Sequence, residues 1–238
     1  MKFFKLLILL FVCFACKQTN KEYDLESKSL SELMMLGHDL TETDVFPEIC
    51  KLLNDSILNK KRSFYMLPSM YSESIKGNDT ILDFKLTFYH TDEFPLMDVV
   101  TLNIILDNDS IFFNNAYCEV DKINSIAKDF IFNPDPLFGY HAVKRYDTKY
   151  FGEIDMSIII ASLVAKIKED KGLSTDTWRL YFTCLHELIS IFEEKQNEMA
   201  MNKWNKNFNS LSDEKKIAIL DVISYRIWLY FAMDNNQL

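Results

Sequence analysis

A stripe of apolar side chains between residues 178 and 192 constrains the fold more than any other feature of the sequence. Its members recur at steps of three and four residues: Trp178, Tyr181, Phe182, Leu185, Leu188, Ile189 and Phe192. This spacing places them on one face of an α-helix, which Asp176 is positioned to cap. Because such a face must be covered, we predict a long helix packed into a core rather than a ligand-binding surface.

Two segments in the middle of the chain have the composition of β-strands. β-Branched and aromatic residues are concentrated in Thr80–His90 and Val99–Asn115, and these residue types pack well on a pleated surface. The first segment alternates apolar with polar residues, which predicts a strand with one solvent-exposed face. In the second segment, "DNDS" at 107–110 predicts a hairpin turn between strands at Thr101–Leu106 and Ile111–Phe113.

The residues before these strands predict one short helix and a second element. Leu30–Leu36 has helical spacing and is followed by Gly37, which would end the helix. Phe46–Leu58 is apolar enough for a buried element, and its type stays open. Residues 17–28 are polar and unpatterned, which predicts a tether.

The second half of the chain predicts further helices and one buried strand. A helix from Asp121 would stop at "NPDP", residues 133–136. Its buried face would be Ile123, Ile126, Ala127, Phe130 and Ile131. Ser157–Gly172 is ambiguous, because its run of isoleucines favours a buried strand whereas its alanines and lysines favour a helix; a strand in at least its second half is the prediction. A last helix would begin at Ser212, with a buried face of Ile217, Leu220, Ile223, Ile227 and Tyr230.

Together these elements predict an α+β fold, in which a small antiparallel or mixed sheet packs against several amphipathic helices. The C-terminal part is expected to be rich in helices. Only five glycines and five prolines occur, which argues against a Gly-rich phosphate loop and a sandwich full of tight turns. We divide the chain into a leader (1–15), a tether (16–28), a region of unknown role (29–98) and an α+β domain (99–238).

The first residues have the pattern of a secretory leader. Lys2 and Lys5 make the start positive, and Phe3–Phe14 forms an apolar run of about a dozen residues. A spanning helix needs ~20 apolar residues, so this run is too short. Small Ala15 directly precedes Cys16, which resembles the lipobox of bacterial lipoproteins. The resemblance implies that the Cys16 thiol receives a diacylglycerol and becomes the new N-terminus after cleavage.

Acylation would place the protein on a membrane. Two or more acyl chains, for example palmitate, are enough for stable anchoring. We therefore expect a lipoprotein attached through Cys16 to the cell membrane or outer membrane, facing the periplasm or the surface. Cys13 does not fit the lipobox pattern, because the residue before it is the branched Val12 rather than a small residue. A plain signal peptide is the alternative.

The charge of the chain argues against nucleic acid as a partner. Loss of Lys2 and Lys5 with the leader removes two positive charges and changes the formal net charge from -9 to -11. A protein this acidic repels phosphate backbones. Attachment to anionic lipid would have to come from acyl chains.

Three cysteines remain in the body after cleavage: Cys50, Cys118 and Cys184. An odd set spread this widely is not a disulfide framework. Two alternatives stay open for these cysteines. Two of them form one disulfide in an oxidising envelope compartment, or all three are buried thiols.

No segment has the pattern of a catalytic, metal or cofactor site. His186 and Glu187 begin like a zinc-protease helix, but Ser190 stands where the second histidine is needed. The other histidines, at positions 38, 90 and 141, have no ligand spacing. "DNDS" lacks the glycine and distal glutamate of a calcium loop, and adjacent Glu193 and Glu194 point in different directions on a helix. We predict no enzyme activity, no metal and no cofactor.

Two aromatic residues follow the long helix at a spacing of four, Trp204 and Phe208. They could pack on the preceding helix or form an exposed aromatic contact. Isolated aromatic side chains are usually buried in a core, so we predict that Trp204 and Phe208 pack on the preceding helix.

From Val100 onward the order of elements resembles the periplasmic domain of ExbD/TolR-type biopolymer transport proteins in the helix-extended form of Bacteroidetes. The matching segments are "TLNIILDNDSIFFNN", "DKINSIAKDFIFN", "LVAKIKEDKG", "DTWRLYFTCLHELISIFEEKQNEM" and "WNKNFNSLSDEKKIAIL". The resemblance implies a periplasmic docking module. That family also has an uncleaved membrane helix with a proton-coupling aspartate, whereas Phe3–Phe14 contains no carboxylate. No proton-coupling residue is therefore carried over.

These observations predict a lipid-anchored envelope protein without catalysis. Its role would be contact with other envelope proteins, in or near a transport or energy-coupling assembly. A lipoprotein that binds a small molecule or peptide is the alternative. In that case the residues before Thr80 and the loop Asn133–His141 would line a pocket.

Overall fold

The computed structural model describes residues 25, 28, 30–58, 63–67, 72–76, 79–83, 89–91, 101–107, 109–132, 143–167 and 171–233. The helices are α2 (Leu30–Leu36), α3 (Phe46–Leu58), α4 (Ile123–Phe132), α5 (Thr175–Trp204) and α6 (Asp213–Leu220), with 3-10 turns η1 (Val120–Lys122) and η4 (Phe208–Ser210). The first strands are β1 (Ser63–Leu67), β2 (Ser72–Lys76), β3 (Asp79–Asp83), β4 (Tyr89–Thr91), β5 (Thr101–Asp107) and β6 (Ser110–Phe113). The others are β7 (Ala116–Cys118), β8 (Val143–Thr148), β9 (Gly152–Ser157), β10 (Ile160–Ile167) and β11 (Ile227–Met233).

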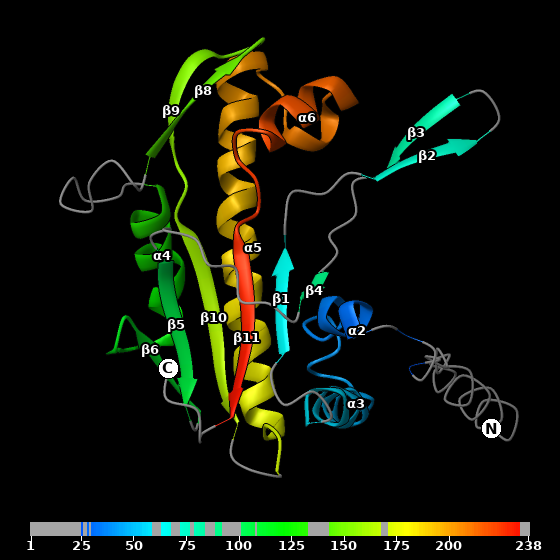
Figure 1. Cartoon of the computed structure of the whole chain (residues 1–238), viewed down its shortest axis with the longest axis vertical. Helices are drawn as coiled ribbons and strands as arrows, with labels where there is room; N and C mark the ends of the chain where they lie inside the picture. The colour runs from blue at the N-terminus through cyan, green and yellow to red at the C-terminus, as the bar shows by residue number, and fades with distance from the viewer. Residues whose placement is uncertain are drawn as a thin grey trace, which may run out of the picture.

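A seven-stranded mixed sheet forms the centre of the molecule, in the order β4-β1-β11-β10-β5-β6-β7 (Figure 1). β10 runs parallel to both β5 and β11, and the remaining neighbours are antiparallel. Strands β2 and β3 form one separate hairpin, and β8 and β9 form another. The carboxyl ends of the three parallel strands therefore lie at the same edge of the sheet, where α5 also begins.

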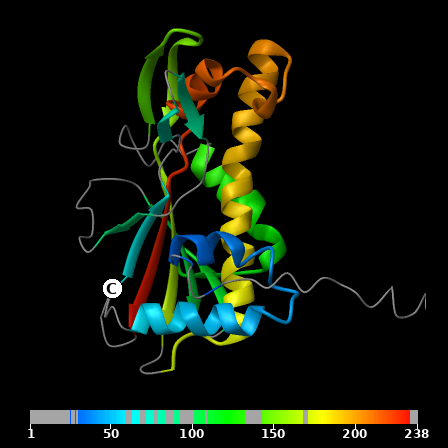
Figure 2. The same ribbon diagram turned by 90° about the vertical axis from the view of Figure 1, so that its right-hand side faces the viewer.

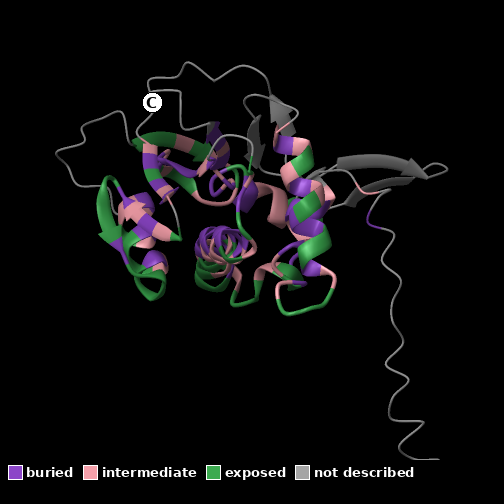
Figure 3. Ribbon diagram, turned by 90° about the horizontal axis from the view of Figure 1, so that it is seen from below, coloured by how far each residue is buried: buried purple, intermediate pink, exposed green. Residues whose placement is uncertain are grey.

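The helices lie on one face of this sheet (Figure 2). Seen from below, α5 is viewed nearly end-on, with its buried side toward the strands (Figure 3). In β5 the buried residues Leu102, Ile104 and Leu106 alternate with more exposed ones, as expected for a strand with one covered face. The core between the sheet and α5 contains Trp178, Tyr181, Phe182 and Phe192. The predicted stripe is therefore buried, and only its member Ile189 is partly exposed.

The α+β prediction is confirmed, and the sheet is of the mixed kind. α2 ends just before Gly37, as predicted, and Phe46–Leu58 is a helix. The hairpin around "DNDS" is confirmed by β5 and β6. A buried strand is present in Ser157–Gly172, but β10 begins in the first half of this segment and spans Ile160–Ile167, and residues 168–170 lie outside the described residues. Residues on both faces of β10 are buried, which agrees with its mostly apolar sequence.

The prediction for the last helix is right about its start, since Ser212 is the N-cap of α6, and wrong about its length. The last helix, α6, ends at Leu220, and Ile227 and Tyr230 belong to strand β11. β11 lies between β1 and β10 near the middle of the sheet. A central strand of this kind is apolar on nearly all its residues, so its sequence also contains apolar pairs at helical spacing.

Other expectations also need correction. Ile126 is 39% exposed and does not share the buried face of α4, which consists of Ile123, Ala127 and Ile131. The segment Thr80–His90 contributes to two strands, β3 and β4, in different sheets, and residues 84–88 lie outside the described residues. Leu25, inside the predicted tether, is buried in the core.

The main sheet joins residues on both sides of the predicted boundary at residue 98. β1 and β4 precede this boundary, and β1 pairs directly with β11. The predicted leader with Cys16 and the loop Asn133–His141 lie outside the described residues. Within the part of the chain that the structure describes, no helix is both long and apolar enough to cross a bilayer.

Candidate functional site

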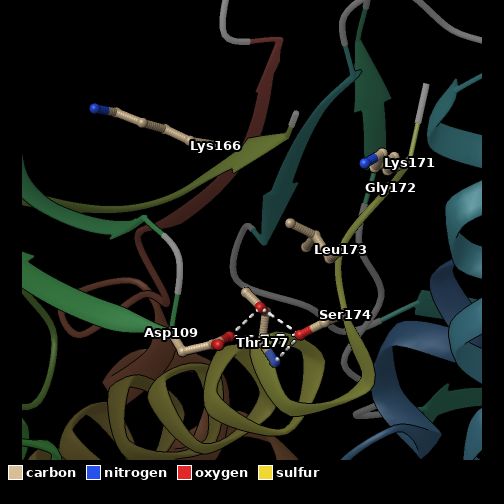
Figure 4. Close-up of a pocket in the computed structure, with 7 residues that line it drawn as sticks. All are labelled: Asp109, Lys166, Lys171, Gly172, Leu173, Ser174 and Thr177. Atoms are coloured by element: carbon tan, nitrogen blue, oxygen red, sulfur yellow. Dashed lines mark hydrogen bonds between the residues drawn. The ribbon is translucent and has the colours of Figure 1, made fainter. Parts of the chain in front are cut away.

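A pocket of about 280 Å³ lies where the sheet meets the start of α5 (Figure 4). We call it the α5 pocket. Its lining residues are Asp109, Lys166, Lys171, Gly172, Leu173, Ser174 and Thr177. They come from the β5–β6 turn, the end of β10 and the connection into α5, so the mixed sheet brings together three separate parts of the chain.

Hydrogen bonds fix the polar side of this pocket. The Ser174 hydroxyl caps α5 by accepting a bond from the Thr177 backbone N–H at 3.0 Å. The Asp109 carboxylate accepts a bond from the Thr177 hydroxyl and a longer one, 3.4 Å, from Ser174. The predicted cap, Asp176, is instead in the first helical turn, where it pairs with Arg179 at 2.8 Å.

The charges around the α5 pocket are largely balanced within the protein. Asp109 places a carboxylate at the positive end of the helix dipole, where an external anion would otherwise bind. The Lys166 ammonium lies 3.3 Å from the Asp107 carboxylate, and Figure 4 shows its side chain directed away from Ser174 and Thr177. A small polar ligand would therefore find few unpaired groups here.

Asn54 on α3 secures the loop beside this pocket, and the sequence did not indicate this role. Its side-chain oxygen accepts bonds from the Leu173 N–H at 2.9 Å and the Trp178 indole N–H at 3.1 Å. Its amide donates to the Leu173 carbonyl at 2.9 Å. Gly172 has a φ of +67°, and a side chain there would meet Asn54. Asn54 begins one of the N-D-[ST] tripeptides that recur at positions 54, 78 and 108, a pattern typical of turns, whereas Asn54 lies inside helix α3.

Two histidines that are far apart in the sequence meet at a second, smaller pocket. His38 follows α2 and His186 lies on α5, and their rings stack with centroids 4.0 Å apart and planes within 8°. The pocket has a volume of about 200 Å³ and also involves Met34, Met35, Asp39, Phe182, Leu185, Ile189 and Glu193. His186 is exposed, and the sequence analysis did not predict its contact with His38.

The neighbours of His186 on α5 have structural partners. Glu187 accepts a bond from the Asn124 side chain at 2.9 Å, and Ser190 accepts a second one at 3.2 Å. Glu194 pairs with Lys128 on α4 at 2.6 Å. These contacts hold α4 against α5. Among the described residues, no group of three or more His, Cys, Asp or Glu side chains is arranged to hold a metal ion.

The three body cysteines are free and buried. Burial raises the pKa of Cys50 and of Cys184 to about 12, and it also raises the pKa of Cys118. The thiolate is the reactive form, so these thiols are poor nucleophiles in the folded protein. Of the two possibilities left open by the sequence, the structure has three buried thiols.

Three exposed apolar side chains lie close together in the sequence, between the edge strand β7 and the first turns of α4. Tyr117 on β7 is 69% exposed, Val120 in η1 is 39% exposed, and Ile126 on α4 follows within a few residues. We call these three residues the β7 patch. By contrast, Trp204 and Phe208 pack against the core as predicted, and Trp204 makes edge contacts with Tyr150 and Phe151.

Comparison of the chain with protein-family models, with curated proteins and with solved structures found no match.

Proposed function

We propose that this protein is a lipid-anchored protein of the cell envelope that has no catalytic activity and acts by contacting other envelope proteins. The leader and Cys16 are the support for the anchor. The resemblance to ExbD/TolR-type periplasmic domains suggests a transport or energy-coupling assembly as the partner. The body would then serve as a docking module held near the membrane.

The observation that carries the proposed contact role is the β7 patch. β7 is an edge strand of the sheet, so it has no neighbour on one side within the described residues. Tyr117 extends from this edge with more than two thirds of its surface exposed. Tyrosine is enriched among the residues that contribute most to protein–protein binding, and an unpaired strand edge can pair with a strand of another chain.

Binding of a small molecule is the second candidate, and the α5 pocket is the observation that favours it. Its volume of about 280 Å³ is at the lower limit of ligand pockets, which usually span ~300–1,000 Å³. Its carboxylate and one of its two lysines already have partners in the protein. The geometry therefore supports the contact role better.

Cross-linking in intact envelopes, followed by pull-down, tests the proposal. We expect the wild type to recover specific envelope proteins and Cys16→Ala to recover none, because the unanchored protein is not concentrated at the membrane. Tyr117→Ser should reduce recovery several-fold. Met201→Ser is the matched control, since Met201 is also an exposed apolar residue, at 43%, but lies on α5.

Two results would contradict the proposed function. Equal recovery by the wild type and Tyr117→Ser would exclude the β7 patch as the contact. A purified Cys16→Ala protein that binds a metabolite, together with a wild type that recovers no proteins, would favour the small-molecule candidate instead.

A further inference from the structure

The smaller pocket, between α2 and α5, has an apolar floor and the size of a single side chain. We call it the α2–α5 pocket. Met34 and Met35 line it from α2, and Phe182, Leu185 and Ile189 line it from α5. Met34 is 1% and Phe182 0% exposed, so this floor is part of the core. The volume of about 200 Å³ is below the ~300–1,000 Å³ of most small-molecule sites. The pocket therefore suits one inserted side chain better than a whole ligand.

The two acidic residues that line the α2–α5 pocket are both exposed, which places them at its mouth. They are Asp39, which follows α2, and Glu193 on α5. The Asp39 carboxylate lies 3.6 Å from His38 Nδ1, too far for a hydrogen bond, and its side chain is 79% exposed. Glu193 also interacts with the Tyr225 hydroxyl, and a carboxylate can accept several bonds. Both oxygens pairs therefore remain able to accept bonds from an incoming donor.

No positive charge of the protein neutralises this mouth. Among the residues that the structure describes, no lysine or arginine lines the pocket. Arg179 lies about one turn before Phe182 on α5, but its guanidinium bonds to the Thr41 carbonyl and to Asp176. The whole chain has a formal net charge of -9, so its field attracts cations and repels anions. The group that fits the mouth of the pocket is therefore a cation.

The stacked imidazoles provide a flat aromatic surface beside these carboxylates. Their centroids are 4.0 Å apart and their planes are within 8°, so nothing fits between them and only an outer face is open to a ligand. A guanidinium is planar, stacks on aromatic faces and offers paired N–H donors to a carboxylate. The ammonium of lysine is a compact, strongly hydrated charge that does not stack in this way. Arginine therefore matches the pocket better than lysine.

We propose that the α2–α5 pocket is a docking site for an arginine side chain of a partner protein. The apolar stem of the arginine packs on Met35 and Ile189, since long cationic side chains cover apolar surface with their methylene groups. The methionine adjusts its flexible side chain to this stem. The guanidinium lies against a histidine ring and donates to Asp39 or Glu193. This contact is separate from the β7 patch and does not depend on it.

Titration of peptides into the purified full-length protein in detergent, labelled with ¹³C at the methionine methyl groups, tests this inference. The probe is acetyl-Gly-Arg-Gly-amide. The control peptide contains citrulline in place of arginine, which keeps the shape of the side chain and removes its charge. We expect the arginine peptide to shift the methyl signals of Met34 and Met35, which Met34→Leu and Met35→Leu assign. The citrulline peptide should bind about tenfold more weakly.

Substitution of single carboxylates tests the role of the mouth. Glu193→Gln and Asp39→Asn remove one charge each and keep the size of the side chain, and both positions are exposed, so the fold should be preserved. Each should weaken binding of the arginine peptide about threefold. Glu194→Gln is the matched control, because Glu194 is the next residue on α5, is also exposed, and pairs with Lys128 outside the pocket. It should leave the affinity unchanged.

Three results would overturn the inference. Equal binding of the two peptides, or unchanged Met34 and Met35 signals, would show that the pocket does not select a cation. Equal weakening by Glu193→Gln and Glu194→Gln would show only a general attraction between an acidic protein and a cationic peptide. Tighter binding of free L-arginine than of the peptide would identify a metabolite site instead of a contact with a protein. Failure of the pull-down with Tyr117→Ser would leave these outcomes unaffected.

Discussion

At Gly37 the backbone that follows α2 packs directly against α5. A Cβ there would lie 2.0 Å from the tip of the Phe182 ring. That ring is fully buried and contacts Phe46 and Trp178, so it cannot move aside. Gly37→Ala should lower the free energy of unfolding by about 3 kcal/mol, measured by urea denaturation.

Gly152→Ala is the matched control for this substitution. Gly152 has a φ of +67°, but a Cβ there would meet nothing within 4 Å. Only backbone strain of about 1 kcal/mol is expected. A loss at Gly37 no larger than that at Gly152 would show that the Phe182 ring yields, contrary to the packing described above.

Arg226 has a buried charge with little compensation. Its Nε donates to the Ile159 carbonyl at 3.2 Å, and its guanidinium lies 5.8 Å from the Phe192 ring. Both terminal nitrogens are buried and have no hydrogen-bond partner among the described residues. Burial lowers the pKa of Arg226 to about 10, which reflects the cost of keeping this charge away from water.

Replacement of this arginine by an apolar residue of similar length should therefore stabilise the protein. We expect Arg226→Met to raise the free energy of unfolding by about 1 kcal/mol in urea denaturation. Arg145→Met is the control, since Arg145 is exposed and pairs with Asp155, and it should change stability by less than about 0.5 kcal/mol. A clear loss of stability in Arg226→Met would mean that the guanidinium makes a strong interaction.

Residue contacts across the molecule could not be predicted from the sequence. The apolar pattern places His186 on the predicted long helix, but nothing near it in the sequence points to His38. Asn54 belongs to a pattern typical of turns, and its bonds to Leu173 and Trp178 depend on how α3 packs beside α5. Local patterns report which face of an element is buried. They do not report which distant element covers it.

At the scale of elements, helix α5 provides a direct test of capping. The sequence favoured Asp176 as the cap, whereas the structure has Ser174 in this position. Ser174→Ala should cost about 1 kcal/mol, because the Thr177 N–H loses its acceptor. Asp176→Ala removes only an exposed pair with Arg179 and should cost less than about 0.5 kcal/mol. If Asp176→Ala instead lost more stability than Ser174→Ala in thermal or urea unfolding, Asp176 would be the cap, as the sequence predicts.

Elements with a long or regular pattern were predictable, and short apolar ones were not. The stripe on α5 follows from periodicity, and the hairpin of β5 and β6 follows from β-branched and aromatic composition with the turn at "DNDS". β11 was predicted as helix because "IWLYFAM" is apolar at nearly every position, and such a run fits a buried helix as well as a buried strand. What decides in favour of a strand is pairing with β1 and β10, which lie far away in the sequence.

At the scale of the whole molecule, the central sheet makes the region before residue 98 part of the same core as the region after it. β1 pairs with β11, and Asn54 on α3 bonds to the start of α5. The sequence analysis separates residues 29–98 from the α+β domain 99–238, because the resemblance to a known family begins only near Val100. Shared strands and shared hydrogen bonds imply that both regions unfold together.

The buried thiols make this cooperativity measurable. Cys50 lies on α3, before the predicted boundary, whereas Cys118 and Cys184 lie after it, and all three are buried. Pulses of an alkylating reagent at increasing urea concentration, read by mass spectrometry of peptides, report when each thiol becomes accessible. One cooperative unit requires the same urea midpoint for all three cysteines. A lower midpoint for Cys50 would mean that α3 detaches before the sheet opens, because Cys118 and Cys184 would then still be protected by the core around α5.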